Sequence, residues 1–215
     1  MEQILHLYGL PYDPAYPVVC FDERPCFLIG ERIAPLPAQK GVVTKEHYAY
    51  EKNGSCALLA SIEPQTAQRL AMVFERRTKR EYALFMQKLA ESYPQATKIR
   101  LIQDNLNTHT TAAFYEVFDA QQAFDLAQRF EFYYTPKCAS WLNMIEIEFS
   151  ALSKQCLHRR IATINELETQ ILILVKERME KKIKIHWQFS IKTARETLNK
   201  PYSELNPQNS IYAKT

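Results

Sequence analysis

The chain lacks any apolar stretch long enough to cross a membrane. The longest later run, "ILILV" at residues 171–175, is far shorter than the roughly 20 residues that a spanning helix needs. The first residues, "MEQILHLYG", include an early glutamate and do not have the pattern of a targeting signal. The sequence therefore predicts neither a membrane segment nor a targeting signal.

Paired cysteines and a strong excess of one charge are lacking as well. The five cysteines are odd in number, and no two of them form a Cys-x-x-Cys pair. They indicate reduced thiols in a cytoplasmic protein. Lysine and arginine total 27 against 24 acidic residues, so the net charge of +3 does not by itself argue for a polyanionic partner.

Short apolar runs alternate with helical periodicity along a chain whose 215 residues can bury a full core. We expect strands at 17–25, 55–62, 69–75, 98–104 and 130–136, and helices at 78–93, 110–128, 140–156 and 164–182. Three strands in a meander, followed by alternating helices and strands, predict an α/β fold: a ribonuclease-H-like mixed sheet flanked by helices. Residues 30–52 fit none of these periods and predict an inserted loop or hairpin.

Acidic residues stand near the ends of two of these strands. Side chains alternate between the faces of a strand, so Asp22 and Glu23 point in opposite directions and only one of them can face a shared site. Asp104 closes a second strand in "QDNLNTHT", and its carboxylate can converge with the first if the two strands are adjacent. An ordinary turn, in which Asp and Asn bond to their own backbone, is the alternative.

A third acidic residue lies on the predicted helix 140–156. Asn143 and Glu146 share one helical face, whereas Glu148 lies about 200° around the helix from Glu146. Only one of the two glutamates can therefore complete a site with the strand carboxylates. Three converging carboxylates would repel one another, which implies a bound cation. Two hard cations held by oxygen ligands are suited to phosphodiester cleavage.

Three blocks carry a resemblance to a known family: "VVCFDERP", "IRLIQDNLNTHT" and "YYTPKCASWLNMIEIEFSAL". In this order they resemble the DDE transposases of the mariner superfamily, particularly its bacterial insertion-sequence branch, over about residues 17–200. The separation of 146 − 104 = 42 residues is longer than in mariner itself, and Cys138 stands where this branch has histidine.

The resemblance implies that Asp22, Asp104 and Glu146 hold two Mg²⁺ or Mn²⁺ ions and that the domain cuts DNA strands and joins them to new targets. It also makes His109 a neighbour of the active site that positions water or the scissile phosphate; a loop histidine with satisfied hydrogen bonds is the alternative. Asn105 and Asn143 would orient carboxylates, or else serve a turn and a helix cap.

Two other functions stay open: a ribonuclease-H-type nuclease without joining activity, and a catalytically silent remnant that binds DNA or its full-length relatives. The resemblance implies DNA as partner, a homodimer, and a location in the bacterial cytosol near the nucleoid. We expect a linker remnant at 1–16, a catalytic domain at 17–160 with the inserted loop 30–52, and a C-terminal helix and tail at 161–215. An upstream DNA-recognition domain is expected to be missing and to be encoded separately or lost.

Exposed basic clusters are usually only solvated surface, but with a DNA substrate they become candidate phosphate contacts. The residues concerned are Arg76, Arg77, Lys79, Arg80, Arg159 and Arg160.

Overall fold

The computed structural model describes residues 1–41, 43, 45 and 47–212, and its centre is a five-stranded mixed sheet. The strand order is β3-β2-β1-β4-β5. The pairs β1–β2 and β2–β3 are antiparallel, whereas β1–β4 and β4–β5 are parallel. The strands are β1 (Val18–Glu31), β2 (Tyr50–Ile62), β3 (Arg69–Phe74), β4 (Ile99–Gln103) and β5 (Phe130–Tyr134). The predicted α/β fold with a ribonuclease-H-like mixed sheet is confirmed.

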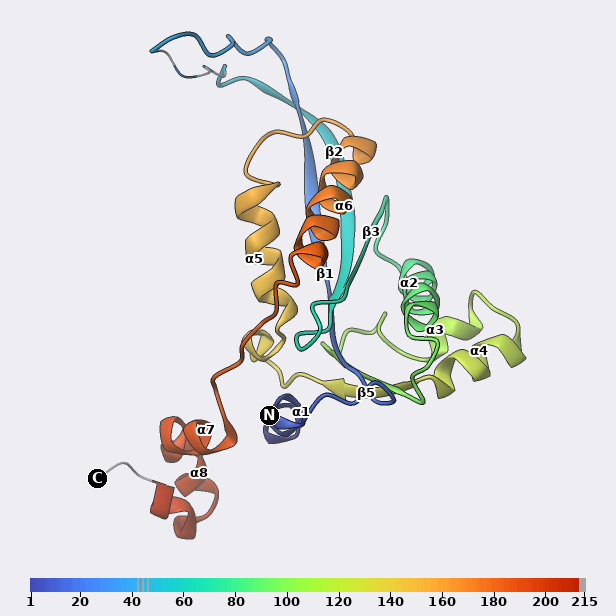
Figure 1. Ribbon diagram of the computed structural model, residues 1–215, viewed down its shortest axis with the longest axis vertical. Coiled ribbons are helices and arrows are strands. Elements are labelled where there is room, and N and C mark those ends of the chain that lie inside the picture. Colours follow the sequence, from blue (N-terminus) through green and yellow to red (C-terminus); the bar gives the residue numbers. More distant parts are fainter. Residues whose placement is uncertain (42, 44, 46, 213–215) are drawn as a thin grey trace.

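Helices cover both faces of the sheet (Figure 1). Val18 and Cys20 of β1 point into one core, together with apolar residues of α1 (Glu2–Gly9), α5 (Ile145–Gln155) and α6 (Ile164–Glu180). Val19 and Phe21 point into the opposite core, which is closed by α2 (Lys79–Ser92), α3 (Ala112–Tyr115) and α4 (Ala120–Gln128). The side chains of β1 therefore alternate between two apolar cores, as expected for a central strand.

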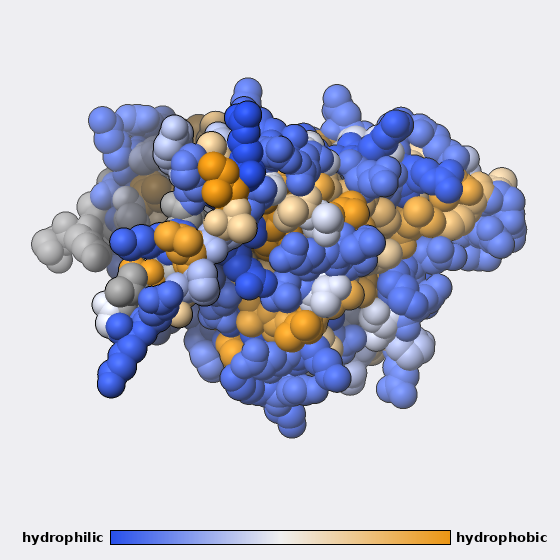
Figure 2. All heavy atoms as spheres, turned by 90° about the horizontal axis from the view of Figure 1, so that it is seen from above, coloured by the Kyte–Doolittle hydropathy of each residue, from blue (hydrophilic) through white to orange (hydrophobic). Residues whose placement is uncertain are grey.

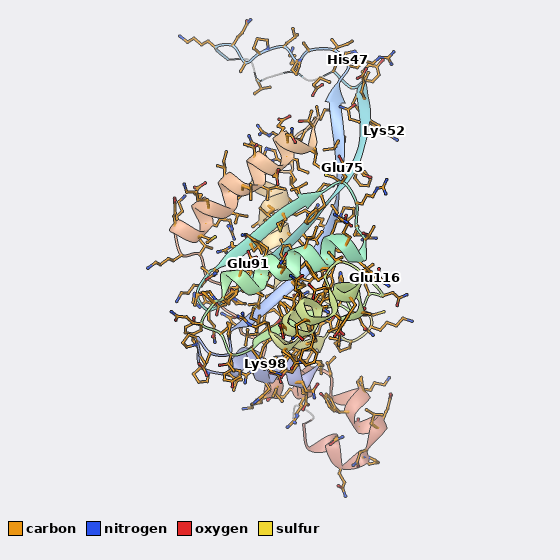
Figure 3. All side chains as sticks on the ribbon, turned by 90° about the vertical axis from the view of Figure 1, so that its right-hand side faces the viewer. His47, Lys52, Glu75, Glu91, Lys98 and Glu116 are labelled. Atoms are coloured by element: carbon orange, nitrogen blue, oxygen red, sulfur yellow. The ribbon has the colours of Figure 1, made fainter. Side chains whose placement is uncertain are left out.

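The first two strands are longer than predicted and continue beyond the sheet as a hairpin (Figure 1). Part of the segment expected as an insertion, 30–52, forms the outer end of this hairpin, where Glu31 pairs with Tyr50. Pro25 lies inside β1 and has no N–H to donate. It is tolerated because β4 pairs only with Val18–Cys20, so no β4 residue lies beside Pro25. In Figure 3, His47 and Lys52 lie at this outer end, far from Glu116. From that end the surface is mostly hydrophilic, with scattered apolar side chains (Figure 2).

Two of the predicted helices are interrupted. The expected helix 110–128 is divided into α3 and α4, because the Asp119 side chain accepts hydrogen bonds from the backbone N–H groups of Gln121 and Gln122 and caps a new helix. The expected helix 140–156 begins as a 3₁₀ turn, η1 (Ser140–Leu142), and continues as α5.

The two ends of the chain are more structured than the sequence suggested. Residues 2–9, expected to belong to a linker, form α1, which buries Ile4, Leu5 and Leu7. The expected C-terminal tail forms α7 (Ile191–Thr197), α8 (Asn199–Leu205) and η2 (Pro207–Tyr212) after α6. Glu2 on α1 binds Arg195 on α7 at 2.8 Å. Within the described part of the chain, no helix has the length and apolarity to span a bilayer.

Candidate active site

The pairing of β1 with β4 places two of the predicted carboxylates at the same level of the sheet. The parallel register pairs Val18 with Arg100 and Cys20 with Ile102, and Asp22 and Asp104 each follow this last pair by two residues. Asp104 is the first residue after β4, and Asp22 lies just beyond the last β1–β4 pair, so both carboxylates lie near the end of β4. The strand adjacency on which their convergence depended is therefore present.

The loop that precedes α5 brings the third part of the site to this edge. Asn143 is buried, and its Nδ2 donates to the carbonyl of Phe21 at 2.8 Å and to Asp22 Oδ2 at 3.4 Å. Glu146 follows in the first turn of α5 and is exposed to solvent. Asn143 therefore fastens the start of α5 to the strand that carries Asp22, and Glu146 is carried toward the same edge.

The surroundings of Asp22 disfavour its charged form. Burial, together with the negative charges of Asp104 and Glu146, raises the pKa of Asp22 to about 7, although a backbone hydrogen bond from Glu23 N lowers it. A positive charge placed among the three carboxylates would relieve this cost.

The donor atoms at this edge fit a hard divalent cation. They are carboxylate oxygens together with the buried Oδ1 of Asn143, which accepts no hydrogen bond from the described residues. Mg²⁺ and Mn²⁺ prefer such oxygen ligands. Across the described ranges, no three His, Cys, Asp or Glu side chains already stand in a closed ligand cluster. The Asp and Glu ligands would thus have to draw together around the ion.

His109 connects the site to the opposite face of the sheet. Its ring is fully buried, with Nδ1 at 2.5 Å from Asp104 Oδ1 and Nε2 at 3.4 Å from Glu23 Oε2. Burial alone would lower the pKa of His109, but the hydrogen bonds to Asp104 and Glu23 raise it to about 9. The ring is therefore an imidazolium at neutral pH that donates to two carboxylates. The ring therefore lies beside Asp104, as a neighbour of the candidate site, and each of its nitrogens contacts a carboxylate.

Several residues around His109 were not singled out from the sequence. Gln103 Nε2 donates to the His109 carbonyl at 3.1 Å, and the Tyr82 hydroxyl donates to Gln103 Oε1 at 3.0 Å. The Tyr82 ring also stacks on the His109 ring, with centroids 4.9 Å apart. Glu23 points away from Asp22, as alternation predicts, yet it binds both His109 and Arg77. The signal available in the sequence was Gln103, a polar residue at the end of an apolar strand.

Other predicted residues lie away from the carboxylates. Asn105 is exposed, and none of the described residues hydrogen-bonds its side chain. Glu148 is buried on the far side of α5, where Arg69 and Arg178 bind it. Burial would raise the pKa of Glu148, but these two arginines lower it below its usual value. Cys138 is exposed, in a left-handed backbone conformation with φ of 62°.

The predicted phosphate contacts differ in how they are engaged. Arg76 and Arg80 are exposed, Arg77 is paired with Glu23 at 3.2 Å, and Lys79 is paired with Glu116. These residues surround the start of α2. Near the end of α5, Arg159 is exposed, whereas Arg160 binds Glu31 at 2.7 Å and lies over the Tyr50 ring.

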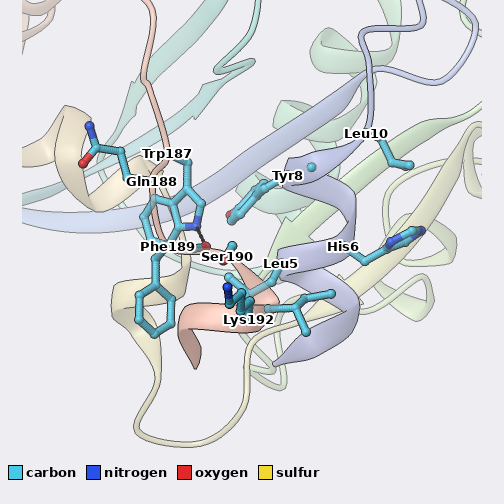
Figure 4. Close-up of a pocket in the computed structure, with 11 residues that line it drawn as sticks. Leu5, His6, Tyr8, Leu10, Trp187, Gln188, Phe189, Ser190 and Lys192 are labelled. Carbon is cyan, nitrogen blue, oxygen red and sulfur yellow. Dashed lines mark hydrogen bonds between the residues drawn. The ribbon is translucent and has the colours of Figure 1, made fainter. Parts of the chain in front are cut away.

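A separate pocket of about 330 Å³ lies between α1 and the segment before α7 (Figure 4). Its walls include Leu5, Tyr8 and Trp187, and the rings of Tyr8 and Trp187 are 5.4 Å apart. The catalytic candidates do not line this pocket, which belongs to the junction between the two ends of the chain.

The family profile of the DDE superfamily endonucleases matches residues 17–168, from the start of β1 into α6. This match covers more than half of the chain and includes all three carboxylates, so the chain belongs to the DDE superfamily endonucleases. Domains of this family act on DNA and generally use divalent metal ions. No curated protein matches the chain.

Proposed function

We propose that this endonuclease domain is the catalytic part of a transposase of the mariner superfamily, from its bacterial insertion-sequence branch, which cuts DNA strands and joins them to new targets. The observation that supports the proposal is the parallel pairing of β1 with β4, which ends two residues before Asp22 and Asp104, together with the hydrogen bonds from Asn143 to the strand that carries Asp22. The three sequence blocks that resemble this branch are the segments that meet there.

In the proposed reaction Asp22, Asp104 and Glu146 hold two divalent ions. When bound, such ions activate the attacking oxygen and stabilise the leaving oxygen of an in-line phosphoryl transfer. Asn143 keeps Asp22 oriented through its Nδ2, and the His109 imidazolium holds Asp104 through Nδ1. Neither residue needs to touch DNA, because both act by fixing the direction of a carboxylate.

The DNA backbone would be held by the basic residues around this edge. Arg76 and Arg80 are exposed beside the start of α2, and Arg77 pairs with Glu23, which in turn contacts His109. Phosphate contacts of this kind fix the position of a duplex and carry no sequence information directly. The described domain is therefore proposed to grip DNA near the carboxylates without reading its sequence.

The experiment is a combined nicking and joining assay on supercoiled plasmid DNA, with Mn²⁺ or Mg²⁺ and a labelled duplex oligonucleotide that ends in a 3′-hydroxyl. We expect metal-dependent nicking and transfer of the label to the plasmid. Asp104→Asn should lose both, whereas Asp125→Asn, which removes the same charge from an exposed position on α4, should lose neither. Nicking without joining would favour the nuclease alternative, and the absence of both activities would favour the silent remnant.

A further inference from the structure

Glu148 occupies an unusual position between two arginines. Its Oε1 lies 3.0 Å from Arg69 Nε and 2.7 Å from Arg178 Nε, and its Oε2 lies 3.1 Å and 3.0 Å from their NH2 groups. Arg178 thus makes two parallel hydrogen bonds with the carboxylate. Arg69 makes one, from its NH2 group, while its Nε lies within ion-pair distance of Oε1. All three side chains are buried, with exposed fractions of 1%, 2% and 9% for Arg69, Glu148 and Arg178.

This cluster joins three elements at the helix that carries Glu146. Glu148 belongs to α5, Arg69 to β3 and Arg178 to α6. Arg69 also donates to the carbonyls of Ala67 and Ile183, at 2.7 Å each, so the segment after α6 is fastened at the same point. Glu146 and Glu148 lie two residues apart on α5. Contacts that fix the rotation of α5 about its axis at Glu148 therefore also fix the side of the helix on which Glu146 lies.

The energetic cost of the cluster argues for a role other than stability. It buries two positive charges and one negative charge, and apolar side chains of similar volume often stabilise a core as well or better. Apolar contacts, such as those of Ile145, Phe149 and Leu152 on α5, are not directional. Paired hydrogen bonds to a carboxylate are directional and hold one rotation of the helix.

The rotation of α5 matters because metal ligands tolerate little displacement. A side-chain atom lies about 5 to 6 Å from a helix axis, so a turn of about 20° moves it by about 2 Å. Ligand distances in metal sites vary by only about 0.2 Å. A small rotation of α5 would therefore carry the Glu146 carboxylate out of reach of an ion shared with Asp22 and Asp104.

We propose that Glu148, Arg69 and Arg178 are positioning residues that fix the rotation of α5 and thereby hold Glu146 toward Asp22 and Asp104. The inference rests on the proposed function, in which Glu146 is a metal ligand. It makes α6 part of the catalytic apparatus, because α6 supplies one of the two arginines.

The test uses Arg178→Met. The variant removes the α6 contact but leaves Glu148 paired with Arg69, so no buried charge loses its only partner. Arg178→Lys, which keeps the charge but cannot make both parallel hydrogen bonds, is a second variant that preserves the fold if methionine does not. The matched control is Val175→Ala, which removes buried methyl groups from the same helix and keeps both arginine partners of Glu148. Mn²⁺ affinity by calorimetry, the Mn²⁺ electron paramagnetic resonance spectrum and plasmid nicking are measured where every variant is folded by circular dichroism.

We expect Arg178→Met to lose about 10- to 100-fold in Mn²⁺ affinity, the range typical when a residue that orients metal ligands is removed. Arg178→Lys should be intermediate, and Val175→Ala should keep the parental affinity and spectrum despite its lower stability. Parental affinity in both Arg178 variants, or equal losses in Arg178→Met and Val175→Ala, would overturn the positioning role while leaving the proposed function in place. If the parent neither binds Mn²⁺ nor nicks DNA, both proposals are wrong.

Discussion

Replacing Asp22 by asparagine should stabilise the metal-free protein even though it destroys the proposed metal site. Burial raises the pKa of Asp22 to about 7 from an ordinary value of 3.8, and the charges of Asp104 and Glu146 raise it as well. Above about pH 7 the folded protein therefore carries a carboxylate that would be more stable in the unfolded chain. Asparagine has nearly the same shape, can still accept the hydrogen bond from Glu23 N, and carries no charge.

The size and pH dependence of this gain follow from the two pKa values. They differ by about three pH units, which corresponds to at most about 4 kcal/mol at 1.36 kcal/mol per unit. Between pH 3.8 and about 7 the folded state binds more protons than the unfolded state, so the parent loses stability as the pH rises through this interval. The Asp22→Asn variant lacks that loss. Its advantage should be absent below pH 3.8 and complete above about pH 7.

Urea unfolding in the presence of a chelator, from about pH 4 to about pH 8, measures this difference directly. Asp125→Asn is the control, because it removes one charge from an exposed position on α4. Addition of Mn²⁺ should stabilise the parent and not Asp22→Asn, so that the order of stability is reversed. The reasoning is refuted if Asp22→Asn is no more stable than the parent above neutral pH, or if its advantage is equally large in acid.

Three further outcomes are expected. Glu146→Gln should abolish metal-dependent nicking while leaving the thermal midpoint unchanged or higher, and a drop in that midpoint would point to a structural role. Arg76→Ala and Arg80→Ala should each weaken binding to all duplexes alike and lower the salt slope by about one, as measured by anisotropy at several salt concentrations. The hydrogen bond from Arg195 holds the pKa of Glu2 at about 2, so this pair stabilises the fold above pH 4.5 and loses its effect as the pH falls through about 2. Glu2→Gln should therefore flatten this part of the curve of stability against pH. An unchanged curve would show that the pair contributes nothing.

The order of the core elements was predictable because it depends on local periodicity. Short apolar runs identified the strands, and helical periodicity over 78–93 identified α2. Features that depend on one capping side chain or on distant packing were missed. Asp119 divides a helix with a single pair of hydrogen bonds, and α1 is stable because Ile4 and Leu7 are buried against other elements. Neither effect is visible in the periodicity of the segment itself.

The candidate site was predictable only to the extent that it follows from the faces of single elements. Alternation separated Asp22 from Glu23, and the helical angle separated Glu146 from Glu148; both separations agree with the structure. The assumption that the two faces of a strand cannot contribute to one site nevertheless excluded Glu23.

The two faces are in fact joined where β4 ends. Strand β4 ends at Gln103, and the loop that follows turns back toward β1. In this loop His109 contacts Asp104 with Nδ1 and Glu23 with Nε2. The His109 ring packs on Phe21 and Tyr82, which belong to the core opposite Asp22. A charge network can thus pass around the end of a short strand from one face of the sheet to the other. Its members are found only when the length of β4 and the path of the loop are known, because neither follows from the residue pattern of β1.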